Sequence, residues 1–170
     1  MTALTAEVQP APQRPARRPR RVLVAAVAAV LAAGAWWWSH PAAFHDVGNV
    51  VTGVTEPGVP AYVGVVEPPD GAVVELVDVT PRVVFNSGDA EVFVRVCRDG
   101  GVGMVYADSL AQWCPVLEAP SGPFGRNDQI VLEVVGEGGV VVVDGVDVTY
   151  RAGVRRGTQA TGLQAAVTIG

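Results

Sequence analysis

Cys97 and Cys114 are the residues with the clearest chemistry in this chain of 170 residues. Their spacing is not the CxxC pattern of a redox pair or a zinc site, and no His or further Cys lies near them. Two such cysteines in an exported protein are expected to pair. We predict a disulfide that holds a surface loop against the domain, because Cys97 falls on the outward face of an alternating strand.

The two histidines, His40 and His45, are the next candidates for chemistry. Binding of copper or zinc would require further donors, which the neighbouring sequence lacks. A nucleophilic triad needs a Ser or Cys beside a His base, and Ser109 has neither a nearby His nor the glycines of a nucleophile elbow. The sequence predicts no catalytic residue, no metal site and no cofactor.

Carboxylates form the remaining candidate site, an acidic cluster of Glu137, Asp144 and Asp147. Acids in one place bind calcium, or work in pairs as in carboxylate-dependent hydrolases. However, the cluster lacks the DxDxDG spacing of a calcium loop, and Asp144 is the residue that an Asp-Gly turn requires. A calcium or small-ligand site and a hydrolase remain alternatives to a non-enzymatic role.

Arg151, Arg155 and Arg156 form the candidate interaction patch, the basic cluster of an otherwise acidic region. Residues 39–170 contain seven Arg and sixteen acids, a net charge of −9, whereas residues 1–21 contain five Arg and one Glu, a net charge of +4. This distribution, with a basic N-terminal segment and an acidic remainder, is typical of a chain whose C-terminal part is exported. An acidic exported region argues against a nucleic-acid partner, whereas the Arg patch could meet an acidic partner or an anionic envelope polymer.

The uncharged segment 22–38 (VLVAAVAAVLAAGAWWW) follows the Arg-rich run and sets the location of everything after it. As a helix it would cover roughly 25 Å, slightly less than a hydrocarbon core of about 30 Å. Arg20 and Arg21 can extend one end, and the Trp cluster can lie at the headgroup level of the other. We predict a single-pass transmembrane anchor with a cytoplasmic N-terminus and an extracytoplasmic C-terminal domain.

Signal cleavage is the alternative for this segment. Ala33-Gly34-Ala35 offers the small residues that a signal peptidase accepts, with Trp36 as the new N-terminus. The run beginning at Arg20 also loosely matches a twin-arginine signal. Under either alternative the bulk of the chain is exported, and the domain would be secreted instead of anchored.

Composition divides the chain into four parts. Residues 1–21 read as a disordered cytoplasmic tail rich in Arg and Pro, residues 22–38 as the membrane helix, residues 39–60 as a stalk, and residues 61–170 as one β-sandwich domain. Short Val-rich runs between turn signals predict an all-β, antiparallel, Ig-like sandwich. The expected strands are residues 62–66, 73–79, 82–85, 91–97, 103–107, 129–135, 140–143, 146–151 and 164–169.

Alternation assigns the two faces of several strands. In residues 91–97, Val92, Val94 and Val96 share the face that we expect to point inward. The same pattern in residues 129–135 gives an inward set of alternate apolar residues. Asp144-Gly145 allows two interpretations, a tight hairpin or a bulge in one longer strand.

Residues 144–151 (DGVDVTYR) and 155–159 (RRGTQ) carry a resemblance. This segment resembles the C-terminal part of uncharacterised, single-span envelope proteins of actinobacteria that have an exported β-sandwich domain. The resemblance implies a fold and a location, and no activity. Together with the residues above, it leads us to expect a membrane-anchored interaction or accessory module of the cell envelope, with an envelope protein as partner.

Overall fold

The computed structural model describes residues 18–39, 44–45 and 48–170, which fall into two compact units, residues 1–37 and 38–170. Helix α1 (Arg18–Ser39), most of which belongs to the first unit, includes the whole apolar segment predicted to be helical. Residues 18–21, predicted as part of the tail, are helical, and the rest of that tail lies outside the described residues.

The apolar side chains of α1 are exposed, with Val30 at 70% and Leu31 at 68%. In the described part of the chain, no helix combines the length and the apolar character that crossing a membrane requires. The predicted helix over 22–38 is therefore present, whereas its predicted role as a transmembrane span is not supported.

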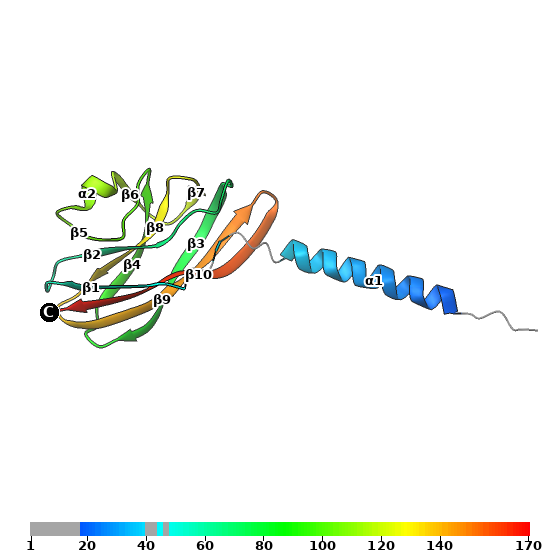
Figure 1. The fold of residues 1–170 in the computed structure, drawn as a ribbon, viewed down its shortest axis with the longest axis horizontal. Coiled ribbons are helices and arrows are strands. Elements are labelled where there is room, and N and C mark those ends of the chain that lie inside the picture. The colour runs from blue at the N-terminus through cyan, green and yellow to red at the C-terminus, as the bar shows by residue number, and fades with distance from the viewer. Residues whose placement is uncertain (1–17, 40–43, 46–47) are drawn as a thin grey trace, which may run out of the picture. The chain divides into compact units, whose positions relative to one another are not determined.

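The second unit is an all-β sandwich of two five-stranded sheets (Figure 1). The first, which we call sheet A, has the order β1 (Val50–Thr55), β10 (Arg155–Ile169), β9 (Gly139–Ala152), β3 (Val74–Asn86) and β7 (Gly122–Phe124). The second, sheet B, has the order β5 (Met104–Tyr106), β2 (Ala61–Val66), β8 (Gln129–Val135), β4 (Glu91–Arg98) and β6 (Val116–Glu118). All pairs are antiparallel except β1 with β10.

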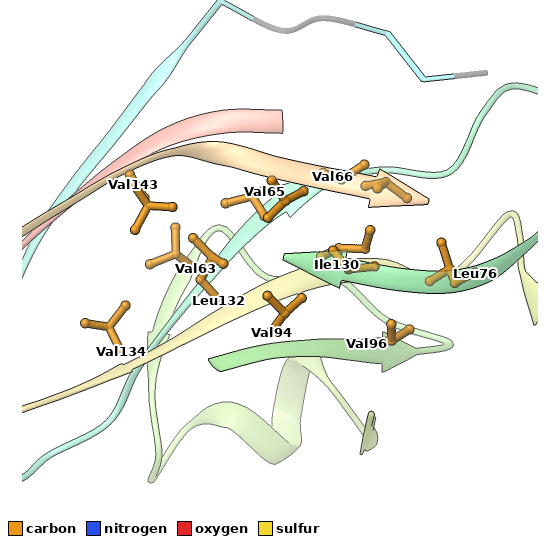
Figure 2. Packing of buried hydrophobic residues seen from close by; sticks show 14 of the residues in the cluster. Val63, Val65, Val66, Leu76, Val94, Val96, Ile130, Leu132, Val134 and Val143 are labelled. Atoms are coloured by element: carbon orange, nitrogen blue, oxygen red, sulfur yellow. The ribbon is translucent and has the colours of Figure 1, made fainter. Parts of the chain in front are cut away.

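The core lies between the two sheets, where valines from each pack against the other (Figure 2). The predicted inward sets are confirmed: Val94 and Val96 of β4 and Leu132 of β8 are buried there. Tyr150 on β9 is fully buried and meets the ring of Phe44 edge-on, with 5.1 Å between ring centroids. Burial of this apolar surface is the main term that stabilises the sandwich.

Three strands are much longer than the sequence predicted, and one of them is β10, which begins at Arg155 where a strand over residues 164–169 was expected. Residues 82–85 continue β3, with Pro81 inside the strand, and residues 140–151 form the single strand β9. The bulge interpretation of Asp144-Gly145 is therefore correct. Gly145 has a φ of +70°, and a Cβ there would collide with the carbonyl oxygen of Thr161 on β10, so the bend requires glycine.

The stalk predicted for residues 39–60 is wrong over much of its described length. Residues 50–55 form β1 at the edge of sheet A, and Phe44 is only 6% exposed within the core. Gln159 fixes Phe44 from both sides, because its amide oxygen accepts from Phe44 N at 3.1 Å and its amide nitrogen donates to Phe44 O at 2.6 Å. Residues 40–43 and 46–47, including His40, lie outside the described residues.

Candidate functional site

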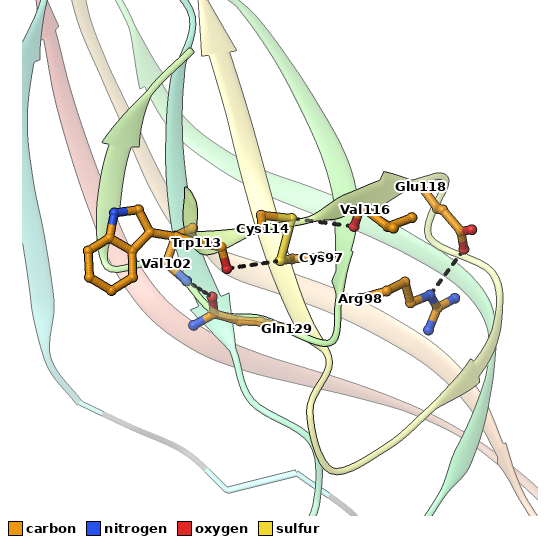
Figure 3. The surroundings of a disulfide bond; sticks show 8 residues. All are labelled: Cys97, Arg98, Val102, Trp113, Cys114, Val116, Glu118 and Gln129. Atoms are coloured by element: carbon orange, nitrogen blue, oxygen red, sulfur yellow. Dashed lines mark hydrogen bonds and ion pairs between the residues drawn. A yellow bond between two sulfur atoms is a disulfide. The ribbon is translucent and has the colours of Figure 1, made fainter. Parts of the chain in front are cut away.

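The disulfide is the first of the predicted sites that the structure confirms: Cys97 and Cys114 are bonded, with their Cα atoms 5.4 Å apart. Cys97 comes from β4 on the outer face of sheet B, and Cys114 follows α2 (Leu110–Trp113). Both are buried, at 0% and 3% exposure (Figure 3). The bridge thus joins sheet B to a chain segment that crosses its outer face, and it does not link the two sheets.

A second hydrophobic cluster surrounds this bridge. Tyr62 and Val131 contribute side chains from sheet B, and Val102 of the segment after β4 packs over them. All three are 8% exposed or less. Gly64 allows this segment to approach, since a Cβ there would strike the carbonyl oxygen of Val102, and Gly64 N donates to Gly103 O at 3.0 Å. We call residues 99–118 the covering segment, because their loops and α2 lie over the outer face of sheet B, while β5 and β6 within them extend that sheet at its two edges.

Trp113 does not cover the bridge, although it precedes Cys114. Its side chain is 52% exposed, and Figure 3 shows the indole pointing away from the two sulfur atoms. The short helix has Ser109 at its N-cap and no side-chain capping hydrogen bond. The backbone of Trp113 has a structural role, because its carbonyl accepts from Gly101 N at 3.2 Å.

A polar network lies beside the cluster on the same face. Glu133 of β8 accepts from Arg95 Nε at 2.8 Å and from the Tyr62 hydroxyl at 3.4 Å. Burial raises the pKa of Tyr62, and the nearby charge of Glu133 raises it further, while Arg95 opposes the shift. Arg95 also lies over the Phe93 ring, 5.6 Å from its centroid. This network is structural in character, because its donors and acceptors satisfy one another.

The acidic cluster predicted from Glu137, Asp144 and Asp147 is not brought together. Glu137 lies in the turn before β9, and Asp144 follows the start of that strand by five residues, which at 3.3 Å per residue is roughly 16 Å. Asp144 instead pairs with Arg82 at 2.9 Å on the outer face of sheet A. Within the ranges that the structure describes, no group of three His, Cys, Asp or Glu residues could hold a metal ion.

The Arg patch is partly assembled. Arg151 and Arg156 are directly opposite each other across β9 and β10, so both side chains lie on the outer face of sheet A. Arg155 points to the other face, where it lines an open hollow with Phe44 and Asp70. Alternation within β10 explains this separation.

Two features of the surface were not predicted from the sequence. One is an open hollow of about 920 Å³ formed by the loops before β3, after β4 and before β8. Asp128 lines it and is held by Arg98 at 3.1 Å and by Gly125 N at 2.8 Å. These loops are far apart in the sequence, so only the fold brings them together.

The other unpredicted feature is an apolar patch on the outer face of sheet A. The strand register places Ala166, Val142 and Phe85 side by side across β10, β9 and β3. The adjacent row contains Val54 of β1 and Val140 of β9, with the exposed Thr168 of β10 between them. Phe85 is 53% exposed and Val54 59%. We define the apolar patch as Val54, Phe85, Val140, Val142 and Ala166.

No match to the chain was found among protein-family models, curated proteins or solved structures. The predicted resemblance to actinobacterial envelope proteins therefore stays a prediction, and the function is argued from the sequence and the geometry above.

Proposed function

We propose that this chain is an exported, Ig-like β-sandwich that acts as a non-enzymatic binding module of the cell envelope. The buried Cys97–Cys114 bridge supports an oxidising, extracytoplasmic location, because such bonds persist where thiols are not kept reduced. The Arg-rich leader before an apolar helix supports export. Anchoring by residues 22–38 and release after cleavage would bring the sandwich to the same compartment.

The strand order supports the Ig-like part of the proposal. In the immunoglobulin arrangement one sheet contains strands B, E and D and the other contains C, F and G. Here β2, β8 and β4 are neighbours in sheet B and correspond to B, E and D. β3, β9 and β10 are neighbours in sheet A and correspond to C, F and G. The six strands follow one another along the chain in the same order as B to G. The covering segment is then an insertion between the fourth and fifth strands of that plan, and the bridge differs from the antibody bridge because it stays on one sheet.

The apolar patch is the observation that carries the binding role. Exposed apolar side chains gathered over neighbouring strands are typical of interaction surfaces, whereas scattered ones are ordinary. Phe85 is the large aromatic residue of the patch, and aromatic residues are enriched in the cores of protein interfaces. The patch carries no charge of its own, and the Arg82–Asp144 pair borders it. This composition, an apolar centre with a polar rim, matches a protein partner.

Site-specific photo-crosslinking tests the proposal. A photoreactive phenylalanine analogue at position 85 is compared with the same analogue at position 93, which lies on the outer face of sheet B and is 41% exposed. In cells that express the full chain, we expect a discrete crosslinked protein from position 85 and none from position 93. Equal products from both positions, or none from position 85, would contradict the binding role.

A fractionation experiment tests the location separately. We expect the full chain to be recovered outside the cytoplasm, with both cysteines protected from alkylation until a reductant is added. Recovery in the cytoplasm with two reactive thiols would contradict export. An N-terminus at Trp36 would favour the secreted form, and an intact N-terminus would favour the anchor.

A further inference from the structure

The turn between β9 and β10 combines an exposed apolar side chain with cationic neighbours. Gly153 and Val154 form this two-residue turn, in which Gly153 has the positive φ of +61°. Val154 is 84% exposed, more than any other large apolar residue in the described part of the sandwich. Arg151 and Arg156 are paired directly behind it on the outer face. We call residues 151–156 the hairpin tip.

We propose that the hairpin tip docks on an anionic lipid surface, with Val154 entering the headgroup region and the arginines contacting phosphates. Arginine donates several hydrogen bonds in a geometry that fits phosphate. An apolar residue at the end of a projecting turn can enter a deformable lipid interface, whereas protein interfaces bury their anchor residues in pockets. The chemistry of the tip therefore favours lipid over an acidic protein.

The local charges permit this contact. Glu75 faces Arg151, with 3.8 Å between the carboxylate and the guanidinium, and both side chains are more than half exposed. Asp70 lines the same hollow as Arg155. Arg156 takes part in no ion pair with a described residue. An ion pair whose two side chains are this exposed is weak, so the Arg151 guanidinium can leave Glu75 and bind a phosphate instead.

Acidic residues at the opposite end of the sandwich would orient the domain on an anionic surface. The three turns there are linked by hydrogen bonds from Gly58 N to Gly136 O at 2.8 Å and from Ser87 N to Val140 O at 3.0 Å. Four exposed acids lie in or next to these turns: Glu56, Asp89, Glu91 and Glu137. β9 separates the two ends by roughly 40 Å, several times the Debye length of about 10 Å at 0.1 M salt. An anionic surface therefore attracts the tip and repels the other end.

Phe44 also lies at the tip end of the sandwich, because it lines the same hollow as Gly153 and Arg155. Its ring packs inward against Tyr150, so the Phe44 side chain does not cover the outer face on which Arg151 and Arg156 lie.

An environment-sensitive fluorophore on the full chain tests the proposal. It is attached to Val154→Cys at the tip or to Glu137→Cys at the opposite end, without reductant so that the native bridge stays closed. The chain is titrated with vesicles of equal parts phosphatidylcholine and phosphatidylglycerol, or of phosphatidylcholine alone. We expect a blue shift only from position 154 and only on the anionic vesicles. The basic leader is present in every sample, so the dependence of the shift on Arg151 and Arg156 is what separates binding by the tip from binding by the leader.

Charge variants complete the test. Each Arg near such a surface contributes about 1 kcal/mol, a factor of about five, so Arg151→Gln with Arg156→Gln should raise the lipid concentration at half response about 25-fold. The double Lys variant should retain most of the response, and Arg82→Gln should leave it unchanged. Equal shifts at positions 154 and 137, equal shifts on neutral vesicles, or no effect of the Gln variant would overturn the proposal. Binding of soluble polyglutamate with the same dependence on the two arginines would also overturn it and indicate an acidic protein partner.

Discussion

The two outer faces of the sandwich differ in what covers them. On sheet B, Tyr62, Val131 and Cys97 are no more than 8% exposed, because residues 99–118 fold over them and are bonded there through Cys114. On sheet A, Phe85 and Val54 are more than half exposed. Within residues 48–170, the chain therefore covers part of the outer face of sheet B and leaves the outer face of sheet A open.

The difference in coverage suggests different roles for the two outer faces, stability of the fold for sheet B and interaction for sheet A. A sandwich needs only its two inner faces to form a core, so apolar residues on an outer face must be covered or remain in contact with water. The chain covers those of sheet B, and they contribute to its stability. The apolar patch of sheet A contributes less to the isolated fold, and under the proposed binding role it is the surface that a partner would cover. Substitutions on the two faces should therefore differ in a systematic way.

Removal of the bridge should give the largest effect on this comparison. For Cys97→Ser with Cys114→Ser, the cysteines are 17 positions apart, and opening a loop of that size should lower the free energy of unfolding by about 3 kcal/mol. Urea unfolding of the oxidised wild type and the double variant, followed by near-UV circular dichroism, measures the loss. A loss below about 1 kcal/mol would show that packing alone holds the covering segment in place.

The bridge and the inner faces could be predicted from the sequence, because both follow from local rules. Val94 and Leu132 lie on strands whose alternation assigns every side chain to a face. β1 was missed since Gly53 interrupts its run, and the glycine is there because the Met104 side chain occupies the space that a Cβ would fill. β6 and β7 have three residues each, too few for alternation to appear.

The apolar patch could not be predicted, because its residues look like core residues. Val142 alternates with Val141 and Val143, so one of the two sets must face outward, but which residues neighbour it depends on register with β3 and β10. Phe85 reaches the outer face only because β3 shifts register twice after Pro81. Such shifts depend on tertiary packing, and no local sequence signal locates them.

A pair of Val→Ala substitutions provides the second test. Val131 on sheet B is fully buried beneath the covering segment, whereas Val142 on sheet A is partly exposed. We expect Val131→Ala to cost about 2 kcal/mol, because burial is lost and a cavity remains, and Val142→Ala to cost less than about 1 kcal/mol. Denaturant midpoints at equal m-values measure both. Equal losses would contradict the assignment of one covered and one open face.

A pair of charge-neutralising substitutions gives a smaller effect. Glu133 on sheet B pairs with Arg95 and has a side chain only 16% exposed, whereas Asp144 on sheet A pairs with Arg82 and is 52% exposed. We expect Glu133→Gln to cost about 1 kcal/mol and Asp144→Asn no more than about 0.5 kcal/mol. Repeating the unfolding in 1 M salt should reduce the smaller loss toward zero. A larger loss from Asp144→Asn would reverse the comparison.

Titration of Tyr62 gives the smallest effect, and it appears only at alkaline pH. Burial and then the charge of Glu133 raise the pKa of this phenol above its ordinary value of about 10. The folded state therefore holds the proton more tightly than the unfolded state, so the stability that this provides is present below pH 10 and is lost as the pH rises through the folded pKa. The difference between the phenolate absorbance titrations of the wild type and Tyr62→Phe isolates this group. In Glu133→Gln the pKa should fall but stay above its ordinary value, because burial is the larger cause and the covering segment remains. A fall to the ordinary value would show that the charge of Glu133 alone causes the shift, and that the outer face of sheet B is more open to water than its packing indicates.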